Sequence, residues 1–309
     1  MLSLVIAALI ALAIPDRSGI ALADARVPAN VSQTDTFNVG MLHVERTGQR
    51  GRTAIIFIPG LFCGPWVWQR EIAALSDRYD VYALTLPGFD GRPRDAGADL
   101  MNRAVASLSD LISTRKLDHP IVVGHSLGGT LAVMFGEKHA NQVSAIITAE
   151  GGYPEAATAE ERQKQVAQNV ARYRGLTRET FAPALKENML QYVITSKVMV
   201  DSVERLATLA DPAATMEWLE AALSLDLTPG LSSITVPLTA IIPFDSVIDP
   251  YQGFKKEADK RDAYTTWLAH APTHSLVMIH NSRHFEMIDQ PEAFDRALYA
   301  AIESARAQH

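Results

Sequence analysis

Residues 121–129 read Ile-Val-Val-Gly-His-Ser-Leu-Gly-Gly, and this stretch decides how the rest of the chain is interpreted. An apolar β-branched run enters a G-x-S-x-G turn with Ser126 at its centre, and a helical pattern follows as far as His139. Such a strand-turn-helix unit exposes the serine hydroxyl, and it needs glycine beside the serine because side chains there would meet the neighbouring helix and strand. The stretch therefore predicts a nucleophilic serine. A glycine-rich turn with an incidental serine is the alternative interpretation.

The sequence around this stretch alternates strand-like and helix-like segments. Apolar strand patterns occur at residues 40–46, 53–58, 81–85, 120–124 and 143–148. Helical patterns occur at residues 68–78, 99–116 and 127–139. Repeated alternation with fully apolar strands predicts an α/β fold, whose mostly parallel sheet is covered by helices on both faces.

The alternation stops between residues 150 and 233, where the pattern is helical only. Thr158 and Glu161 fit a capping box, and Asp211 followed by Pro212 fits a helix start. Strand patterns return at residues 234–242 and 275–279, before a last helix at residues 291–305. The chain is therefore expected to form one core in two parts with a helical cap inserted between them. The core parts are residues 24–149 and 234–309, and the cap is residues 150–233.

The first 23 residues have the features of a secretory leader. Residues 2–14 form an almost unbroken apolar run, which is too short for a membrane span of about 20 residues. An Ala-Leu-Ala sequence at residues 21–23 follows, of the kind that signal peptidase accepts. We expect cleavage after Ala23 and a periplasmic or secreted enzyme with no membrane span in the mature chain. A leader that does not function would leave the protein in the cytoplasm.

The composition excludes several classes of protein. The 309 residues carry 28 Lys and Arg against 35 Asp and Glu, a net charge of −7, which argues against nucleic acid as a partner. A hydrophobic share of 48% is enough for a substantial core. The single cysteine, Cys63, excludes an internal disulfide and is expected to be a small buried hydrophobe.

Four separated motifs, in a fixed order, carry a resemblance to a known family. They are Phe-Ile-Pro-Gly-Leu at residues 57–61, Leu-Pro-Gly-Phe-Asp-Gly at residues 86–91, the Ser126 turn, and His-Phe at residues 284–285 with Asp-Gln-Pro-Glu at residues 289–292. Together they resemble the α/β-hydrolase superfamily, in its serine-nucleophile branch with a helical cap. The resemblance covers about residues 38–306. It implies a Ser-acid-His triad in that chain order.

The resemblance points to His284 as the base that activates Ser126. Other histidines near the chain's end are His270, His274 and His280. Their spacing fits no helical metal-binding pair, and we expect neither a metal nor another cofactor.

The acid should follow the strand at residues 234–242, where Asp245 is nearest to the strand end. Asp245 is the favoured candidate. Asp249, which precedes Pro250, and Glu150, which follows the strand at residues 143–148, remain open.

The amides of Leu61 and Leu127 are implied as the oxyanion-binding donors. Pro59 replaces the histidine that is usual in the family's oxyanion loop, which removes a side-chain hydrogen bond and leaves the Leu61 amide available. Phe62, beside this loop, and Tyr153, in the cap, are expected to contact substrate.

These residues predict a serine hydrolase that cleaves small hydrophobic carboxylic esters through an acyl-enzyme. The same triad could open lactones, hydrolyse a C–C bond or perform perhydrolysis without a cofactor. A ligand-binding protein on the same fold is the alternative from another class. The oligomeric state is left open.

Overall fold

The computed structural model describes residues 34–95, 97–154 and 158–307. The predicted leader at residues 1–23 lies outside these ranges. Within them, eight strands form one sheet in the order β1-β2-β4-β3-β5-β6-β7-β8. The strands are β1 (Asp35–Val39), β2 (Leu42–Gly48), β3 (Ala54–Ile58), β4 (Asp80–Thr85), β5 (Ile121–His125), β6 (Ala145–Ala149), β7 (Leu238–Phe244) and β8 (His274–His280).

The sheet is parallel from β4 to β8, while β2 pairs antiparallel with both β1 and β4. Residues 40–46 were predicted as one strand, and they instead begin with the β1–β2 turn at Gly40, whose φ is +53°. Strands β3, β5 and β6 are buried along their whole length, as their apolar sequences predict.

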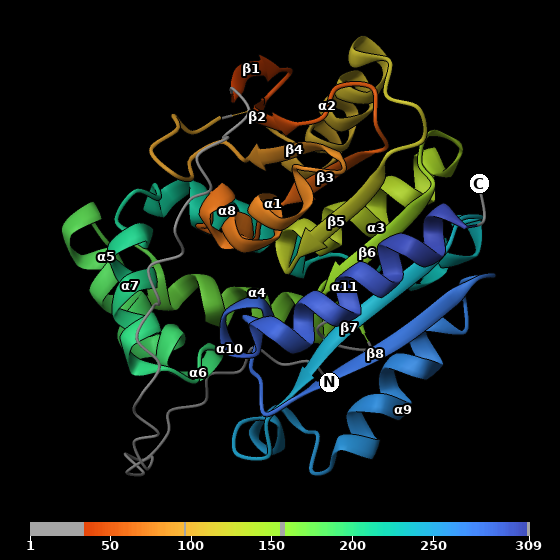
Figure 1. The fold of residues 1–309 in the computed structure, drawn as a ribbon. Helices are drawn as coiled ribbons and strands as arrows, with labels where there is room; N and C mark the ends of the chain where they lie inside the picture. The colour runs from red at the N-terminus through yellow and green to blue at the C-terminus, as the bar shows by residue number, and fades with distance from the viewer. Residues whose placement is uncertain (1–33, 96, 155–157, 308–309) are drawn as a thin grey trace.

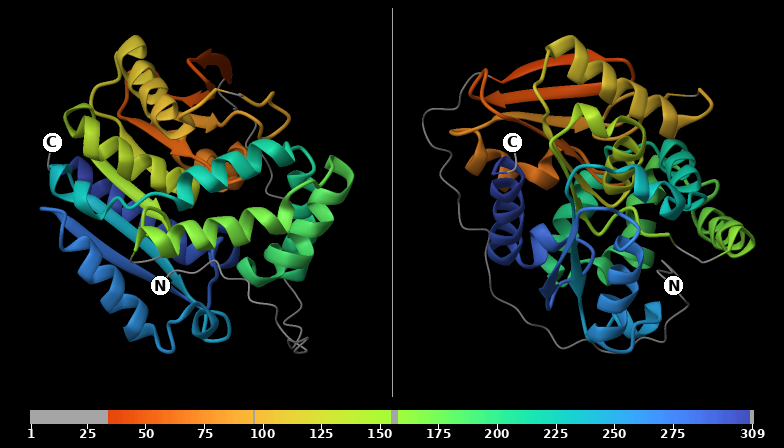
Figure 2. Two further views of the ribbon diagram at one scale, coloured as in Figure 1. Left: turned by 180° about the vertical axis from the view of Figure 1, so that it is seen from behind. Right: turned by 90° about the vertical axis from the view of Figure 1, so that its right-hand side faces the viewer.

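Helices cover both faces of the sheet, so the predicted α/β architecture is confirmed (Figures 1 and 2). Helices α1 (Gln69–Leu75) and α11 (Pro291–Arg306) lie on one face. Helices α2 (Leu100–Arg115), α3 (Leu127–His139) and α9 (Glu257–Leu268) lie on the other. The short α10 (Glu286–Asp289) precedes α11. Helix α9, which contains Lys260, is not among the predicted elements.

The chain between β6 and β7 is helical, as its pattern predicts. It contains α4 (Ala159–Tyr173), α5 (Arg178–Leu185), α6 (Gln191–Val193), α7 (Lys197–Ala207) and α8 (Pro212–Leu223), with a π-helical turn at Lys186–Leu190 and a 3₁₀ turn at Thr228–Ser233. The Thr158–Glu161 capping box is formed, and Asp211 caps α8 through the amides of its first turn. These helices gather on one side of the sheet (Figure 1). We refer to them as the cap.

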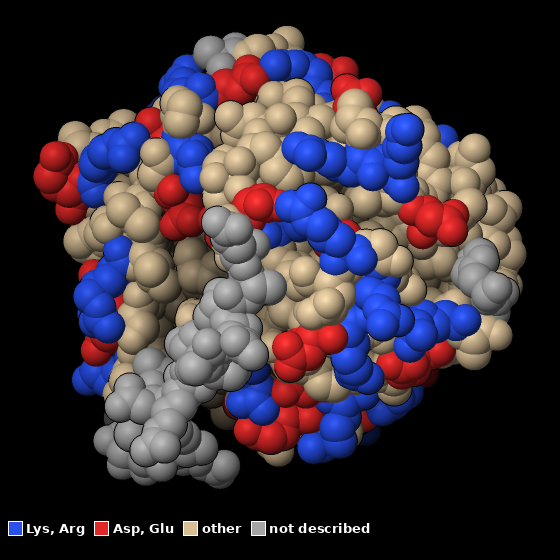
Figure 3. All heavy atoms as spheres, turned by 45° about the horizontal axis from the view of Figure 1, so that its top comes forward, with Lys and Arg blue, Asp and Glu red and all other residues tan. Residues whose placement is uncertain are grey.

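The described surface mixes both signs of charge. Figure 3 shows basic and acidic side chains interspersed over one face of the molecule. No helix in the described ranges is both long and apolar enough to cross a membrane.

Candidate active site

Ser126 occupies the strained turn that the sequence predicts, between β5 and α3. Its φ of 53° and ψ of −118° lie outside the regions that non-glycine residues favour. A Cβ on Gly124 would lie 2.2 Å from the carbonyl oxygen of Gly128, and a Cβ on Gly128 would lie 2.2 Å from that of Ile58. Only glycine fits at both positions, so the motif's spacing follows from the close approach of β5, α3 and β3.

The start of α3 supplies one donor for an oxyanion. The Leu127 amide belongs to the first turn of the helix, where no carbonyl within the helix can accept its proton. The helix dipole also favours negative charge at this end. Leu61, in the loop after β3, lines the same pocket as Ser126 and Leu127. The two predicted oxyanion residues therefore lie in one site with the serine, and their roles remain predictions.

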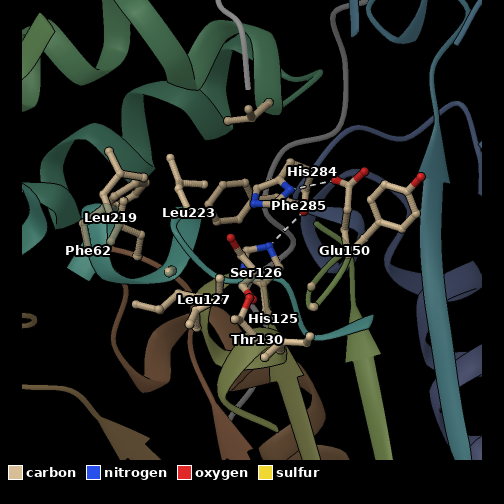
Figure 4. A pocket seen from close by; sticks show the side chains of 18 of the residues that line it. Phe62, His125, Ser126, Leu127, Thr130, Glu150, Leu219, Leu223, His284 and Phe285 are labelled. Carbon is tan, nitrogen blue, oxygen red and sulfur yellow. Dashed lines mark hydrogen bonds and ion pairs between the residues drawn. The ribbon is translucent and has the colours of Figure 1, made fainter. Parts of the chain in front are cut away.

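His284 lies in the loop between β8 and α10 and contacts a carboxylate. Its Nδ1 is 2.7 Å from Oε2 of Glu150, the residue that directly follows β6. Figure 4 shows the imidazole between Ser126 and Glu150. The hydrogen bond fixes the tautomer, because a carboxylate accepts and Nδ1 must therefore carry the proton. Nε2 is then the nitrogen left to act as a base toward the serine.

The prediction of Asp245 as the partner of His284 is wrong. Asp245 Oδ2 instead pairs with Arg283 Nε at 3.4 Å, and Oδ1 accepts the amides of Val247 and Ile248. The Asp245 side chain thus closes its own turn and neutralises the guanidinium next to the histidine. Arg283 in turn donates to cap carbonyls, including that of Gln191 at 2.9 Å.

Glu150 is held in place from two sides. Its backbone has a φ of 40°, and its amide donates to the carbonyl of Ile241 on β7 at 2.9 Å. Its second carboxylate oxygen, Oε1, accepts from Nζ of Lys260 at 2.7 Å. Burial alone would raise the pKa of Glu150, but the Lys260 ammonium and the His284 hydrogen bond outweigh burial and hold that pKa below its ordinary value. The carboxylate is therefore ionised at neutral pH.

His125 supports the same histidine through the backbone. Its Nε2 lies 2.9 Å from the carbonyl oxygen of His284, and a carbonyl only accepts, so Nε2 carries the proton. Burial, followed by the neighbouring His284, lowers the pKa of His125 to about 3. A neutral His125 is therefore a fixed donor rather than a second base.

The pocket around Ser126 is lined mainly by apolar side chains from the core and the cap. Core residues include Phe62, Leu127, Tyr264 and Phe285, and cap-segment residues include Tyr153, Met189, Val193, Leu219, Leu223 and Leu227. Both predicted substrate contacts, Phe62 and Tyr153, are in this lining, and Tyr153 is stacked on Tyr264 with ring centroids 4.4 Å apart. Among the described residues that line the pocket there is no Lys or Arg.

The remaining candidates lie elsewhere. His274 bonds the Ala271 carbonyl at 2.8 Å, and His280 pairs with Glu257 at 3.1 Å on the surface. In the described part of the chain, no group of three or more His, Cys, Asp or Glu side chains is arranged to hold a metal ion. Cys63 is buried, and burial raises the pKa of its thiol well above the ordinary value, so it is a poor nucleophile.

Sequence reasoning missed Lys260. A charged residue in a segment without a clear apolar run is expected to be exposed, so Lys260 was not recognised as a buried residue. The spacing of Lys260, Tyr264, Trp267 and Leu268 on one helical face could have revealed the helix.

Comparisons with known proteins agree with the α/β fold described above. Residues 55–297 match the model of the "Alpha/beta hydrolase family". Over 264 residues the chain is 24% identical to 3-oxoadipate enol-lactonase 2 of Acinetobacter baylyi, which covers 82% of this chain and 90% of that protein. An esterase from Thermogutta terrifontis has a similar fold, with a TM-score of 0.70 at 18% identity over 89% of this chain and 99% of that one.

A shorter match joins the chain to 1-acylglycerol-3-phosphate O-acyltransferase ABHD5 of Rattus norvegicus. The two are 35% identical over 109 residues, which is 34% of this chain. The matched part spans only 31% of that protein's own length.

Proposed function

Because the chain belongs to the alpha/beta hydrolase family, we propose that it is a serine hydrolase that cleaves small, neutral, hydrophobic carboxylic esters. The observation that carries the proposal is the 2.7 Å bond from His284 Nδ1 to Glu150, on an imidazole that lines an apolar pocket with Ser126. In the neutral imidazole this bond leaves Nε2 free to accept the serine proton, in a pocket that both residues line.

In the proposed mechanism, His284 Nε2 takes the proton of Ser126 as Oγ attacks the ester carbonyl. The oxyanion accepts hydrogen bonds from the amides of Leu61 and Leu127. Glu150 stabilises the imidazolium that forms, and His284 then donates the proton to the leaving alcohol. A water molecule, deprotonated by the same histidine, attacks the acyl-enzyme and releases the carboxylic acid.

The absence of Lys and Arg among the described lining residues supports neutral substrates. A substrate carboxylate would enter an apolar pocket without a counter-ion, and burying an unpaired charge costs several kcal/mol. The ionised Glu150 behind His284 would add repulsion. The similarity to an enol-lactonase, which extends over 82% of this chain, favours lactones as a second substrate class, because lactone opening uses the same acyl chemistry.

A matched ester pair tests the proposal. p-Nitrophenyl hexanoate and the mono-p-nitrophenyl ester of adipic acid have the same chain length, and the second ends in a carboxylate. We expect kcat/KM for the hexanoate to be at least about tenfold higher, which corresponds to about 1.4 kcal/mol. A panel of acyl esters and neutral lactones would run beside it. A preference for the adipate ester, or turnover retained by Ser126→Ala, would refute the proposal.

A further inference from the structure

A buried lysine joins two carboxylates behind the candidate active site. Nζ of Lys260, on α9, lies 2.7 Å from Glu150 Oε1 and 2.8 Å from Asp249 Oδ1. The Lys260, Glu150 and Asp249 side chains are only 1%, 6% and 4% exposed. With the bond from Glu150 to His284, these contacts form a continuous chain of four side chains, Asp249-Lys260-Glu150-His284.

Each member of this chain is fixed by a second contact. Asp249 lies in the 3₁₀ turn Asp249–Gln252, and its Oδ2 accepts the amide of Asp245 at 2.7 Å. Glu150 uses Oε1 for Lys260 and Oε2 for His284. Lys260 therefore fixes the orientation of the carboxylate, so that the oxygen it does not bind faces the imidazole.

Without the lysine, the cluster would hold two buried carboxylates and no cation while His284 is neutral. Two carboxylates, those of Glu150 and Asp249, share one ammonium. Glu286 and His125 also interact electrostatically with the cluster. Burial raises the pKa of Glu286 well above its ordinary value and lowers that of His125 to about 3, so burial disfavours the charged form of both groups.

The resting cluster thus carries a net charge of −1 while His284 is neutral. It becomes neutral overall when His284 takes the serine proton. Burial raises the pKa of Asp249 above its ordinary value, whereas that of Glu150 is held low. Of the two carboxylates, Asp249 therefore takes a proton before Glu150, which stays ionised beside the histidine.

We propose that Lys260 is a positioning residue of the active site, which acts through Glu150 by keeping that carboxylate charged and aimed at His284 while it neutralises Asp249. This inference rests on the proposed function only in that Ser126 is activated by His284. It does not depend on which ester or lactone is the substrate.

The test measures how fast a fluorophosphonate probe labels Ser126 between pH 4 and pH 9, which needs no knowledge of the substrate. The variants are Lys260→Met and Lys260→Met combined with Asp249→Asn. Arg261→Met is the matched control, because it removes a positive charge one position along α9 from an exposed pair with Glu257. Thermal melts show which variants are folded.

Lys260→Met should slow labelling at pH 7 by at least about tenfold and move the acid limb of the profile to higher pH. The reason is that burial and Asp249 then raise the pKa of Glu150 without opposition from an ammonium. Adding Asp249→Asn should raise the labelling rate at least about threefold above that of Lys260→Met, because it removes the unpaired second charge. The control should keep the wild-type profile.

A wild-type acid limb in Lys260→Met, or a double variant no faster than the single one, would overturn the inference. If Lys260→Met does not fold, the double variant alone is compared with the wild type. The inference then requires the acid limb of its labelling profile to lie at higher pH than that of the wild type. If Ser126 is labelled but no ester or lactone is turned over, the proposed substrate class fails, and the pH comparison still decides the role of Lys260.

Discussion

Glu150→Gln is the substitution that most directly tests the site, because the structure dictates how the new amide must be oriented. The amide nitrogen cannot face the Lys260 ammonium, so the amide oxygen stays with Lys260 and the NH₂ group takes the place of Oε2 beside His284. That NH₂ group donates, and His284 Nδ1 must then accept. The proton of the imidazole moves to Nε2, which can no longer accept the proton of Ser126.

We expect kcat to fall by about 10⁴-fold, which is the loss seen when the histidine of a catalytic triad is held in the wrong tautomer. At about 1.36 kcal/mol for each factor of ten, this corresponds to about 5.5 kcal/mol of transition-state stabilisation. KM should change much less, because Glu150 lies behind the histidine and its side chain is almost fully buried.

The assay is steady-state hydrolysis of p-nitrophenyl hexanoate at pH 7, with circular dichroism to confirm folding. Asp245→Asn is the matched control, since Asp245 pairs with Arg283 at 3.4 Å and does not contact His284. The kcat of the control should stay within about tenfold of wild type, because its substitution weakens a hydrogen-bonded ion pair that lies away from the reacting atoms. A Glu150→Gln enzyme within tenfold of wild type would refute the assignment, and so would an Asp245→Asn enzyme that loses activity as severely as Glu150→Gln.

Three further variants test other parts of the structure. His125→Phe removes the donor to the His284 carbonyl and should lower kcat by about 3- to 10-fold with little change in KM, which steady-state kinetics will show. Burial raises the pKa of Glu71 to about 8, so the folded state keeps a proton that the unfolded state loses above about pH 4.5, and stability falls as pH rises between these values. Glu71→Gln should abolish that fall. The free energy of unfolding, measured with urea, should therefore show that the substitution is up to about 4 kcal/mol more stabilising, relative to wild type, at pH 8 than at pH 5. Leu223→Trp fills part of the pocket and should lower kcat/KM for octanoyl relative to acetyl esters by about tenfold, and an unchanged ratio would place the acyl chain elsewhere.

The features that the sequence predicts well are those set by local chemistry. The glycines around Ser126 are required because a Cβ at Gly124 or Gly128 would lie 2.2 Å from a backbone oxygen, so the motif and its geometry are inseparable. The cap's helix starts at Thr158 and Asp211 depend on side chains that bond amides two or three residues away. The apolar strands β3, β5 and β6 are legible because they are buried on both faces.

Helix α9 was missed because a charge replaces an apolar side chain on its buried face. Lys260 is 1% exposed and lies one turn before Tyr264, which is fully buried, and two turns before Trp267 and Leu268. A hydrophobic pattern that starts with lysine looks solvent-exposed, since lysine is almost never fully buried unless it is paired. Its partner Glu150 lies 110 residues earlier in the chain, and its partner Asp249 lies in a separate 3₁₀ turn before α9, so no helical pattern could have shown that this lysine is buried.

The acid was misplaced for a related reason. Strands β6 and β7 are neighbours, so the loops that follow them bring three carboxylates toward the same edge of the sheet. Strand order alone does not show which of the three carboxylates pairs with His284, but the positions of the neighbouring cations do. Arg283 pairs with Asp245, and Lys260 pairs with Asp249 while leaving one oxygen of Glu150 free for the imidazole. A buried carboxylate needs a counter-charge, so the position of each cation determines which acid remains available to His284. Predicting the acid therefore requires pairing every buried charge first, which needs the tertiary structure.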